Sequence, residues 1–362
     1  MSLSLPVVRG RGAATNPRNR FERLHVDRSG WGDPDDPGPG TRLLADASRS
    51  VLSFNDSPDV ALDVGLNPYR GCEHGCVYCY ARPSHEYLGM SAGLDFESRI
   101  LVKRDAPGLL REALAKPGWR PRPIMLSGVT DAYQPAERRL RLTRRCLEVL
   151  AGFRNPVAVT TKSYLVTRDR DLLGELARDD AAAVTLSITT LRTELQRILE
   201  PRATTPARRL GAIRVLADAG VPVGVNVAPV MPGLTDHELP AILEAAAEAG
   251  ATFAGYVLLR LPHGVAPLFE RWLATHLPER KEKVLSRLRS LHGGRLYDAR
   301  FGTRGRGEGP FAEQLRQLFR VHRDRLGLDR PPPLSAAAFR RPEPDPGPQL
   351  GLFDGPGRPG GR

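Results

Sequence analysis

Residues 71–80 read Gly-Cys-Glu-His-Gly-Cys-Val-Tyr-Cys-Tyr and place Cys72, Cys76 and Cys79 close together in the chain. The two glycines in this stretch allow the backbone to turn tightly, so the three thiols can face one small volume. The chain has only four cysteines, and a cluster of three is typical of a metal site, whereas disulfide frameworks spread their cysteines along the chain. The stretch therefore predicts a metal centre on one loop.

Three cysteines are one ligand fewer than an iron–sulfur cluster usually takes. A [4Fe-4S] cluster held by Cys72, Cys76 and Cys79 would leave one iron open to the amino and carboxylate groups of S-adenosyl-L-methionine. One electron from such a cluster cleaves the sulfonium and yields a 5′-deoxyadenosyl radical. The alternative is a structural zinc with Cys146 or His74 as the fourth ligand. Zinc sites usually pair two CxxC-type halves, and Cys146 lies in a predicted helix, so the cluster is favoured.

Downstream of this loop, short apolar runs alternate with amphipathic stretches. The expected strands are 124–127, 157–161, 183–188, 221–227 and 253–259, and the expected helices are 108–116, 137–153, 169–178, 206–219 and 236–249. Short apolar runs between helical patterns are typical of buried parallel strands, and their alternation predicts an α/β fold. With a sixth strand before the loop or near residue 100, the pattern fits a partial (β/α)6 barrel. The iron–sulfur loop and the active site would then lie at the barrel mouth, where the strands end.

Composition divides the chain into four parts. We expect an irregular basic N-terminal extension with few contacts over 1–50, the partial barrel over 51–266, a C-terminal helical cap over 267–330, and a disordered tail over 331–362. The cap contains two helical patterns, at 267–292 and 310–327. The tail is rich in proline, glycine and arginine and lacks the apolar residues needed to form a core.

The chain is basic, with 53 lysines and arginines against 41 aspartates and glutamates and a net charge of +12. A basic surface suits a polyanion such as nucleic acid, because cations neutralise phosphates and release counterions. An arginine-rich composition also follows from a GC-rich genome, so charge alone leaves both explanations open. The sequence shows no uncharged apolar run of about 18 residues and no export signal. We therefore expect a cytoplasmic protein without membrane contact.

The stretch from about 60 to 260 resembles the spore photoproduct lyase group of radical S-adenosylmethionine (radical SAM) proteins, often called DNA repair photolyase-like. The resemblance rests on residues 71–80, on Ser187-Ile-Thr, on Glu200-Pro201 followed by Arg209, and on Val227-Ala-Pro-Val230. It implies a lyase-like radical reaction, a nucleic-acid substrate, and an electron donor such as flavodoxin or ferredoxin. Glu200 is expected either to hydrogen-bond the ribose of the cosubstrate or to form a buried ion pair with a nearby arginine.

In the resembled lyases, two tyrosines flank the third cysteine and help to relay a hydrogen atom, and Tyr78 and Tyr80 match them. The alternative is that Tyr78 only offers its backbone to adenine and that Tyr80 only packs the loop. The lyases also carry a hydrogen-donor cysteine just before a Ser/Thr-Asp pair. In the matching segment, Ser127-Gly-Val-Thr-Asp131, Gly128 stands at that position. This departure argues against the reversal of thymine dimers.

Polar residues near the ends of the expected strands are the candidates for binding S-adenosyl-L-methionine. They are Thr130 and Asp131 for the methionine amine, Lys162 for its carboxylate, Ser187 as the residue resembling a fourth-strand hydroxyl of the family, and Asn226 near the end of the fifth strand. Polar residues that end apolar strands suit the mouth of a barrel. The alternative for each is that it caps a helix or stays solvated.

The tail contains Gln349-Leu350-Gly351-Leu352-Phe353, which matches the bacterial sliding-clamp-binding pentapeptide Gln-Leu-x-Leu-Phe. Its glutamine would supply a polar anchor, and the three large apolar side chains would fill a hydrophobic groove in extended form. The alternatives are a staple that packs back on the barrel, and chance, because short motifs match often. A clamp partner would make DNA the natural substrate.

Together these patterns predict a radical SAM enzyme that acts on damaged or modified DNA, with Tyr78 and Tyr80 as catalytic candidates. One alternative is an enzyme that modifies RNA or a peptide with the same radical. A second is a clamp- or DNA-binding protein whose cluster is structural or redox-sensing. The formation of 5′-deoxyadenosine after reduction distinguishes the enzyme from the binding protein.

Overall fold

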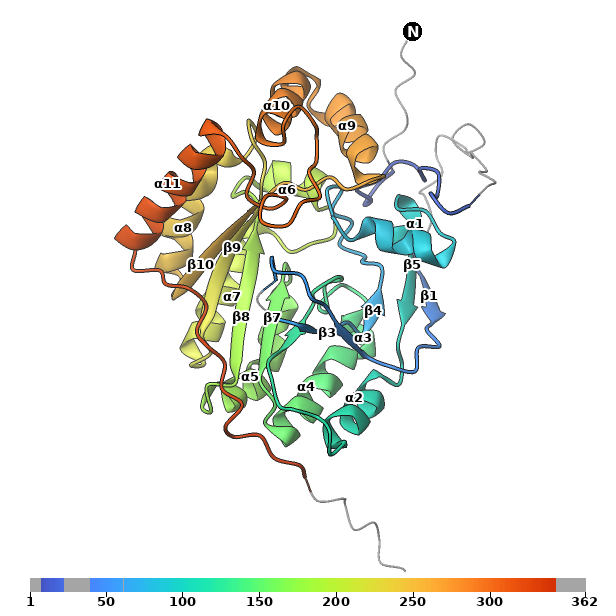
Figure 1. The fold of residues 1–362 in the computed structure, drawn as a ribbon, viewed down its shortest axis with the longest axis vertical. Coiled ribbons are helices and arrows are strands. Elements are labelled where there is room, and N and C mark those ends of the chain that lie inside the picture. The colour runs from blue at the N-terminus through green and yellow to red at the C-terminus, as the bar shows by residue number, and fades with distance from the viewer. Residues whose placement is uncertain (1–7, 23–39, 61, 343–362) are drawn as a thin grey trace, which may run out of the picture.

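The computed structural model describes residues 8–22, 40–60 and 62–342. Its centre is a seven-stranded sheet in the order β10-β9-β8-β7-β6-β3-β2 (Figure 1). The strands are β2 (Leu52–Phe54), β3 (Val64–Leu66), β6 (Ile124–Leu126), β7 (Val157–Thr161), β8 (Ala182–Ile188), β9 (Val223–Val230) and β10 (Phe253–Leu258). Neighbours from β3 to β10 pair in parallel, and β2 pairs antiparallel with β3. The predicted partial barrel is confirmed, and β3, before the cysteine loop, is its sixth parallel strand.

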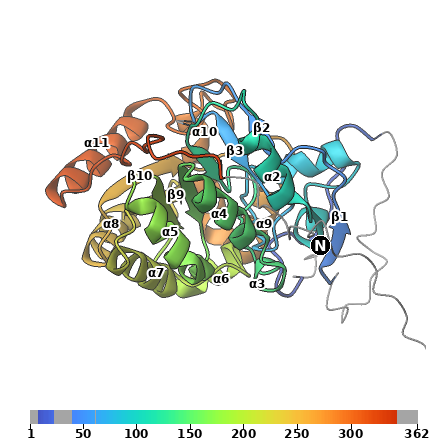
Figure 2. The same cartoon turned by 90° about the horizontal axis from the view of Figure 1, so that it is seen from below.

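Helices connect these strands and surround them on the outside (Figures 1 and 2). They are α2 (Ala106–Ala115), α3 (Glu137–Leu140), α4 (Leu142–Phe153), α5 (Arg170–Ala177), α6 (Thr193–Leu199), α7 (Pro206–Asp218) and α8 (Leu239–Glu248), with short 3-10 helices at Tyr164–Asp169 and Asp236–Glu238. The predicted helix 137–153 is interrupted at Arg141, whose φ of 52° is left-handed and cannot continue a right-handed helix. The predicted helix 236–249 likewise begins as a 3-10 turn before α8.

The main core lies between the strands and these helices. Apolar side chains from successive strands, such as Leu126, Val159, Val184 and Val225, are almost completely buried. Burying each such side chain contributes roughly 1.5–3 kcal/mol. The sequence pattern of apolar strands flanked by amphipathic helices therefore accounts for the layered packing.

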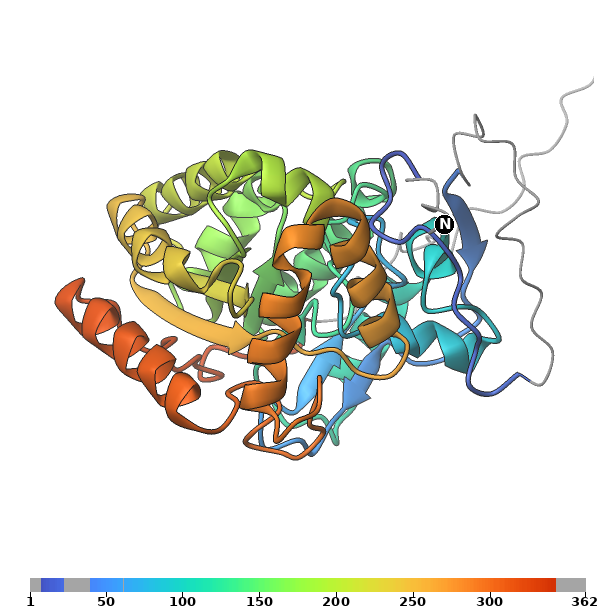
Figure 3. The same ribbon diagram turned by 90° about the horizontal axis from the view of Figure 1, so that it is seen from above.

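Three helices follow the barrel: α9 (Val265–His276), α10 (Pro278–Leu291) and α11 (Pro310–Arg325). The predicted helix 267–292 is two helices, because Pro278 lacks a backbone N–H and starts α10. Figure 3 shows α9 and α10 over one end of the barrel, next to the N-terminal segment, and Arg271 on α9 donates a hydrogen bond to the Thr15 hydroxyl. Among the described residues, no helix has the length and apolar character needed to cross a membrane.

The N-terminal part is more ordered than expected. A second sheet, in the order β1-β5-β4, stands beside the barrel and consists of β1 (Arg42–Ala45), β4 (Tyr69–Arg70) and β5 (Arg99–Val102). The 3-10 helix Arg82–Leu88 and α1 (Leu94–Ser98) lie next to it. The segment 8–22 packs on this part of the chain, where the backbone amides of Gly12 and Ala13 donate to Glu97. Residues 8–22 contain no helix or strand but make more contacts than expected, because the buried Glu97 carboxylate needs donors. The extension over 1–50 as a unit stays a prediction.

Two predictions on the chain's organisation stay predictions. The four-part division with boundaries near 51, 267 and 331 is one of them. The other is the clamp-binding pentapeptide at 349–353, which lies outside the described residues.

Candidate active site

The three clustered cysteines lie on the loop that follows β4. Cys72 and Cys76 are buried and Cys79 is half-buried, and all three thiols are free. Gly71 and Gly75 have φ values of 82° and 68°, in the left-handed region that glycine adopts without strain. A Cβ at Gly71 would also lie 2.8 Å from the His85 ring. Glycine at these positions is thus what allows the loop to fold back on itself.

The cysteine loop forms one wall of a cavity of about 280 Å3. The other walls come from the carboxyl ends of β6 to β10, as is usual for barrels of this kind. All ten residues predicted as ligands or catalytic groups line this cavity: Cys72, Cys76, Cys79, Tyr78, Tyr80, Thr130, Asp131, Lys162, Ser187 and Asn226. The fold therefore brings the predicted site together, while the role of each residue stays a prediction.

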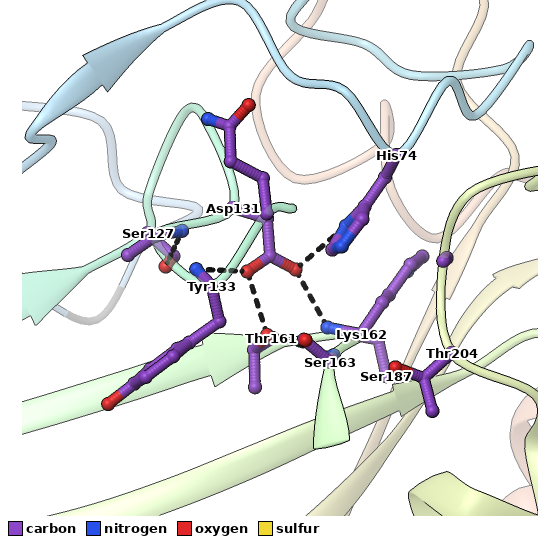
Figure 4. Close-up of polar contacts among 12 residues, drawn as sticks. His74, Ser127, Asp131, Tyr133, Thr161, Lys162, Ser163, Ser187 and Thr204 are labelled. Atoms are coloured by element: carbon purple, nitrogen blue, oxygen red, sulfur yellow. Dashed lines mark hydrogen bonds and ion pairs between the residues drawn. The ribbon is translucent and has the colours of Figure 1, made fainter. Parts of the chain in front are cut away.

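Asp131 is the most fully hydrogen-bonded of the predicted ligands shown in Figure 4. Its Oδ1 accepts from the Tyr133 amide (2.9 Å) and the Thr161 hydroxyl (2.7 Å). Its Oδ2 accepts from the Lys162 amide (2.8 Å) and lies 3.3 Å from His74 Nδ1. Burial alone would raise the pKa of Asp131, but His74 and these hydrogen bonds lower it to about 2. A carboxylate has about four acceptor positions, so binding the methionine amine would require Asp131 to exchange one of these bonds.

The remaining predicted ligands differ in how freely they can reach a bound molecule. The Thr130 hydroxyl donates to the Tyr69 carbonyl (3.0 Å). Lys162 Nζ donates to the Ala228 carbonyl (3.2 Å) and keeps two further hydrogens. Ser187 on β8 and Asn226 on β9 are direct partners in the sheet register. Lys162 thus keeps free donors toward the cavity, and its contact with a carboxylate stays a prediction.

Tyr78 points into a buried polar cluster that we call the anchor, made of Tyr78, Thr189, Glu200 and Arg209. The Tyr78 hydroxyl donates to Glu200, and it lies 3.1 Å from the Thr189 hydroxyl. Glu200 forms a buried ion pair with Arg209. Burial alone would raise the pKa of Glu200, but Arg209 and Lys162 lower it to about 2. Of the two roles expected for Glu200, the structure shows the buried ion pair.

Tyr80 lies at the opening of the cavity, in a group that we call the mouth: Tyr80, Gly128, Val129 and Arg260. The Tyr80 side chain is 47% exposed, and its hydroxyl donates to the Gly128 carbonyl (2.7 Å). The Arg260 guanidinium lies 4.8 Å from the centre of the Tyr80 ring, within the range of a cation–π contact. A Cβ at Gly128 would meet Met125 Sδ at 3.7 Å, an ordinary contact, so the cavity has room for a side chain there.

The lining residues that sequence reasoning did not assign to the site include His74, which pairs with Asp131, as well as Met125 and Arg260. Met125 lies on β6 and Arg260 two residues after β10. Lys162 was identified as a polar residue at the end of an apolar strand. The same criterion applies to Arg260. No local signal indicated the pairing of His74 with Asp131, because the two are far apart in the chain.

The donor set fits an iron–sulfur cluster better than a single zinc. Cys146 is completely buried in the apolar core on α4 and does not line the cavity, so it cannot complete a zinc site with the loop. Over the described ranges, no three His, Cys, Asp or Glu side chains converge closely enough to hold one metal ion. Three thiols around a cavity suit a cluster in which each binds a different iron. Burial raises the pKa of Cys72 and Cys76, so a strongly positive centre is needed to bind them as thiolates.

Comparison with known proteins agrees with this geometry. The model of the radical SAM superfamily matches residues 66–246, half of the chain. An uncharacterized protein of Mycobacterium tuberculosis is 38% identical over 229 residues, which is 63% of this chain and 66% of that protein. An uncharacterized protein of Methanocaldococcus jannaschii is 31% identical over 173 residues, 48% of this chain and 62% of that protein. The matches thus span slightly less than two thirds of these relatives' own length.

Among solved structures, spore photoproduct lyase complexed with dinucleoside spore photoproduct has a TM-score of 0.58. It is 17% identical, and the superposition covers 80% of this chain and 82% of that one. A double mutant of the same lyase with bound AdoMet also has a TM-score of 0.58, at 18% identity. At this level of identity the likeness establishes the fold.

The superfamily uses a [4Fe-4S] cluster and S-adenosyl-L-methionine, the two cofactors expected from the sequence, and its enzymes need an electron donor. The cysteine spacing, the partial barrel and the cavity at its strand ends are all consistent with the family match. The chain therefore belongs to the radical SAM superfamily.

Proposed function

We propose that the chain is a cytoplasmic radical SAM enzyme that acts on a damaged or modified base in DNA. The observation that carries the proposal is the mouth, where half-exposed Tyr80 lies against Arg260 beside the cysteine loop. An aromatic ring stacks with a nucleobase, and a guanidinium adds stacking and phosphate binding. The net charge of +12 and the fold shared with a lyase complexed with a dinucleoside lesion support DNA over a peptide.

Cys72, Cys76 and Cys79 would hold the cluster, and Lys162 would bind the carboxylate of S-adenosyl-L-methionine. When bound, the two cofactors together supply a 5′-deoxyadenosyl radical that removes a hydrogen atom from the substrate. Ser187 and Asn226, neighbours on β8 and β9, would hydrogen-bond the rest of the cosubstrate. Asp131 would keep the Lys162 backbone and His74 in place through the bonds shown in Figure 4.

The two tyrosines have different proposed roles. Tyr78 is a positioning residue, because its hydroxyl is committed to Glu200 in the buried anchor. Tyr80 is the catalytic candidate, because it brings a transferable O–H hydrogen to within hydrogen-bond distance of position 128. Gly128 itself has no hydrogen-donating side chain, so the proposed lyase-like reaction differs from thymine-dimer reversal.

Hydrogen transfer from labelled DNA tests the proposal. Anaerobically reconstituted protein is reduced with dithionite and incubated with S-adenosyl-L-methionine and deuterated, ultraviolet-irradiated DNA. We expect 5′-deoxyadenosine that contains deuterium from the DNA, measured by mass spectrometry. Deuterium transfer from labelled RNA or peptide, and not from DNA, would identify a different substrate class. If no 5′-deoxyadenosine forms at all, the chain is a binding protein with a structural or redox-sensing cluster.

A sliding clamp is proposed as a second partner through residues 349–353. A peptide that covers this motif should bind the cognate clamp, and the Leu352→Ala/Phe353→Ala peptide should not, because two apolar anchors are removed. Equal binding of the two peptides in a calorimetric titration would remove the clamp from the proposal without affecting the DNA substrate.

A further inference from the structure

The N-terminal segment packs against the outer side of the cysteine loop. The inner side of the loop lines the cavity, and Gly12 packs directly on Gly75 from the outside. A Cβ at Gly12 would lie only 1.8 Å from the Gly75 carbonyl oxygen. Glycine is therefore needed at position 12 for this contact, in which two backbone segments meet directly.

Glu97 fastens this segment to the loop. Its carboxylate accepts from the amides of Gly12 (3.0 Å) and Ala13 (2.9 Å). It also pairs with the buried guanidinium of Arg82, which in turn donates to the Cys76 carbonyl (2.9 Å). The covering segment is thus connected to a cluster-binding residue through buried hydrogen bonds, which give it a defined position.

Arginines lie around this contact. Arg11 and Arg202 both donate to the Thr41 hydroxyl, at 3.2 and 3.1 Å, and the Arg202 amide donates to the His74 carbonyl in the loop (3.2 Å). Arg9 and Arg42, next to these residues in the chain, are exposed. We call Arg9, Arg11, Arg42 and Arg202 the collar.

Within the described part of the chain, Glu73 and Glu97 are the carboxylates beside Arg11 and Arg202, and both are buried and paired. Glu73 is 5% exposed and lies 3.2 Å from Arg202, and Glu97 is completely buried against Arg82. The described residues of this surface therefore present mainly positive charge to a partner. None of the four collar arginines lines the cavity, so a molecule bound to the collar lies outside the loop, away from the mouth.

We propose that the collar is the docking surface for a small acidic electron-carrier protein of the flavodoxin class. The proposal rests on the proposed function, which requires the cluster to gain one electron. In this step the carrier loses one electron, the cluster gains it, and no atom or proton moves. Electron tunnelling slows steeply with distance, and the collar is close to the cysteine loop, because the Arg202 amide donates to the His74 carbonyl. Opposite charges steer such encounters, and redox interfaces are small.

Nucleic acid is the other polyanion that a basic surface could bind. It is disfavoured at the collar, because a substrate base must reach the inner side of the loop through the mouth. DNA held at the collar would present its bases to the outer side of the loop. The geometry therefore favours a partner that exchanges only an electron with this side.

Charge reversal tests the collar. The Arg9→Glu/Arg42→Glu variant changes exposed residues and leaves the contacts of Arg11 and Arg202 intact. The matched control is Arg320→Glu/Arg330→Glu, with the same charge change at exposed positions on and just after α11, on the opposite side of the molecule from β1 (Figure 1). Reduction of the reconstituted cluster by reduced acidic flavodoxin is followed by stopped-flow absorbance, and flavodoxin binding by calorimetry.

At low salt, the collar variant should be reduced by flavodoxin at least about tenfold more slowly than the wild-type protein and should bind flavodoxin more weakly. Its reduction by dithionite should be unchanged, and so should every rate of the control variant. The wild-type rate with flavodoxin should fall as ionic strength rises. A rate that is insensitive both to salt and to the collar variant would overturn the proposal.

Two other outcomes are also decisive. If the collar variant loses affinity for DNA and is reduced by flavodoxin normally, the collar is a nucleic-acid surface and the proposal is wrong. If the collar variant fails to assemble its cluster, the docking proposal is tested instead with the milder Arg9→Gln variant and with the salt dependence of the wild-type rate. Absence of 5′-deoxyadenosine with dithionite would refute the proposed function, while slow reduction of the collar variant would still support the docking site.

Discussion

The anchor and the mouth lie on either side of Cys79 and use the same residue type in opposite ways. Tyr78 is 6% exposed and its hydroxyl is held by Glu200, which pairs with Arg209. Tyr80, two positions later, is 47% exposed and lies against Arg260 at the cavity opening. The difference shows that a sequence match of two tyrosines does not imply two equivalent roles. We infer that the anchor sets the position of the loop and that the mouth meets the substrate.

The loop that joins the two regions gives the largest expected effect. Cys76→Ala should abolish the cluster, because it removes one of only three protein ligands. Cys146→Ala, the matched control in the core of α4, should keep about four irons and four sulfides per chain. Iron and sulfide analysis with electron paramagnetic resonance measures both. Loss of the cluster in Cys146→Ala would show a fourth protein ligand and contradict an open iron.

Within the anchor, Glu200→Ala should have the next largest effect. It leaves the Arg209 guanidinium buried without its partner, which costs about 3–5 kcal/mol. Glu200→Gln retains the hydrogen-bonding shape and should cost less. Urea unfolding of the apo proteins measures the loss of stability. If Glu200→Ala unfolds like the wild-type protein, the anchor does not hold the loop, and the contrast with the mouth fails.

Tyr78→Phe should have an intermediate effect on stability. It removes one hydrogen bond to a buried carboxylate, worth about 1.5–3 kcal/mol, while Thr189 and Arg209 still hold Glu200. With dithionite as reductant, the folded variant should still cleave S-adenosyl-L-methionine. A variant of full stability that no longer transfers hydrogen would make Tyr78 catalytic and remove the distinction between the two tyrosines.

Tyr80→Phe should change stability by less than about 0.5 kcal/mol, as expected for a half-exposed side chain. Its effect should appear with substrate, as 5′-deoxyadenosine formed without a matching amount of product. The ratio of the two, measured by chromatography, tests this uncoupling. An unchanged ratio would mean that Tyr80 only packs the loop, which is the alternative stated from the sequence.

Gly128→Cys is expected to give the smallest change in stability and a gain of function. The cavity has room for a side chain at this position, which is next to the Tyr80 hydroxyl. The added thiol would supply the donor side chain that position 128 lacks in the wild-type chain, so a spore photoproduct dinucleotide should be repaired slowly by the variant. Gly128→Ser, similar in size and without a thiol, is the control. Efficient repair by the wild-type protein would show that the departure at Gly128 has no functional meaning.

The sequence alone predicted the features that depend on local spacing. The three cysteines share one loop, and the alternation of apolar and amphipathic runs follows from periodicity. Because parallel strands end at the same edge, the polar residues after them, such as Asp131 and Lys162, could be assigned to one site in advance. The interruptions at Arg141 and Pro278 were missed, since the helical pattern of apolar residues continues across both positions.

Only the tertiary structure decided the contacts between residues far apart in the chain. No local pattern indicates that His74 pairs with Asp131, that Glu97 holds the segment at Gly12, or that Arg260 lies over Tyr80. Likewise, Tyr78 and Tyr80 are equivalent in sequence, and only Tyr78 is met by Glu200, which lies 122 residues further along the chain at the end of α6. The physical reason is that a buried charge must find its partner wherever the fold supplies one. The spacing of the three cysteines along the chain was thus enough to predict the cofactors. Which tyrosine is held in the buried anchor and which lies at the open mouth depends on the pairing of charges in three dimensions.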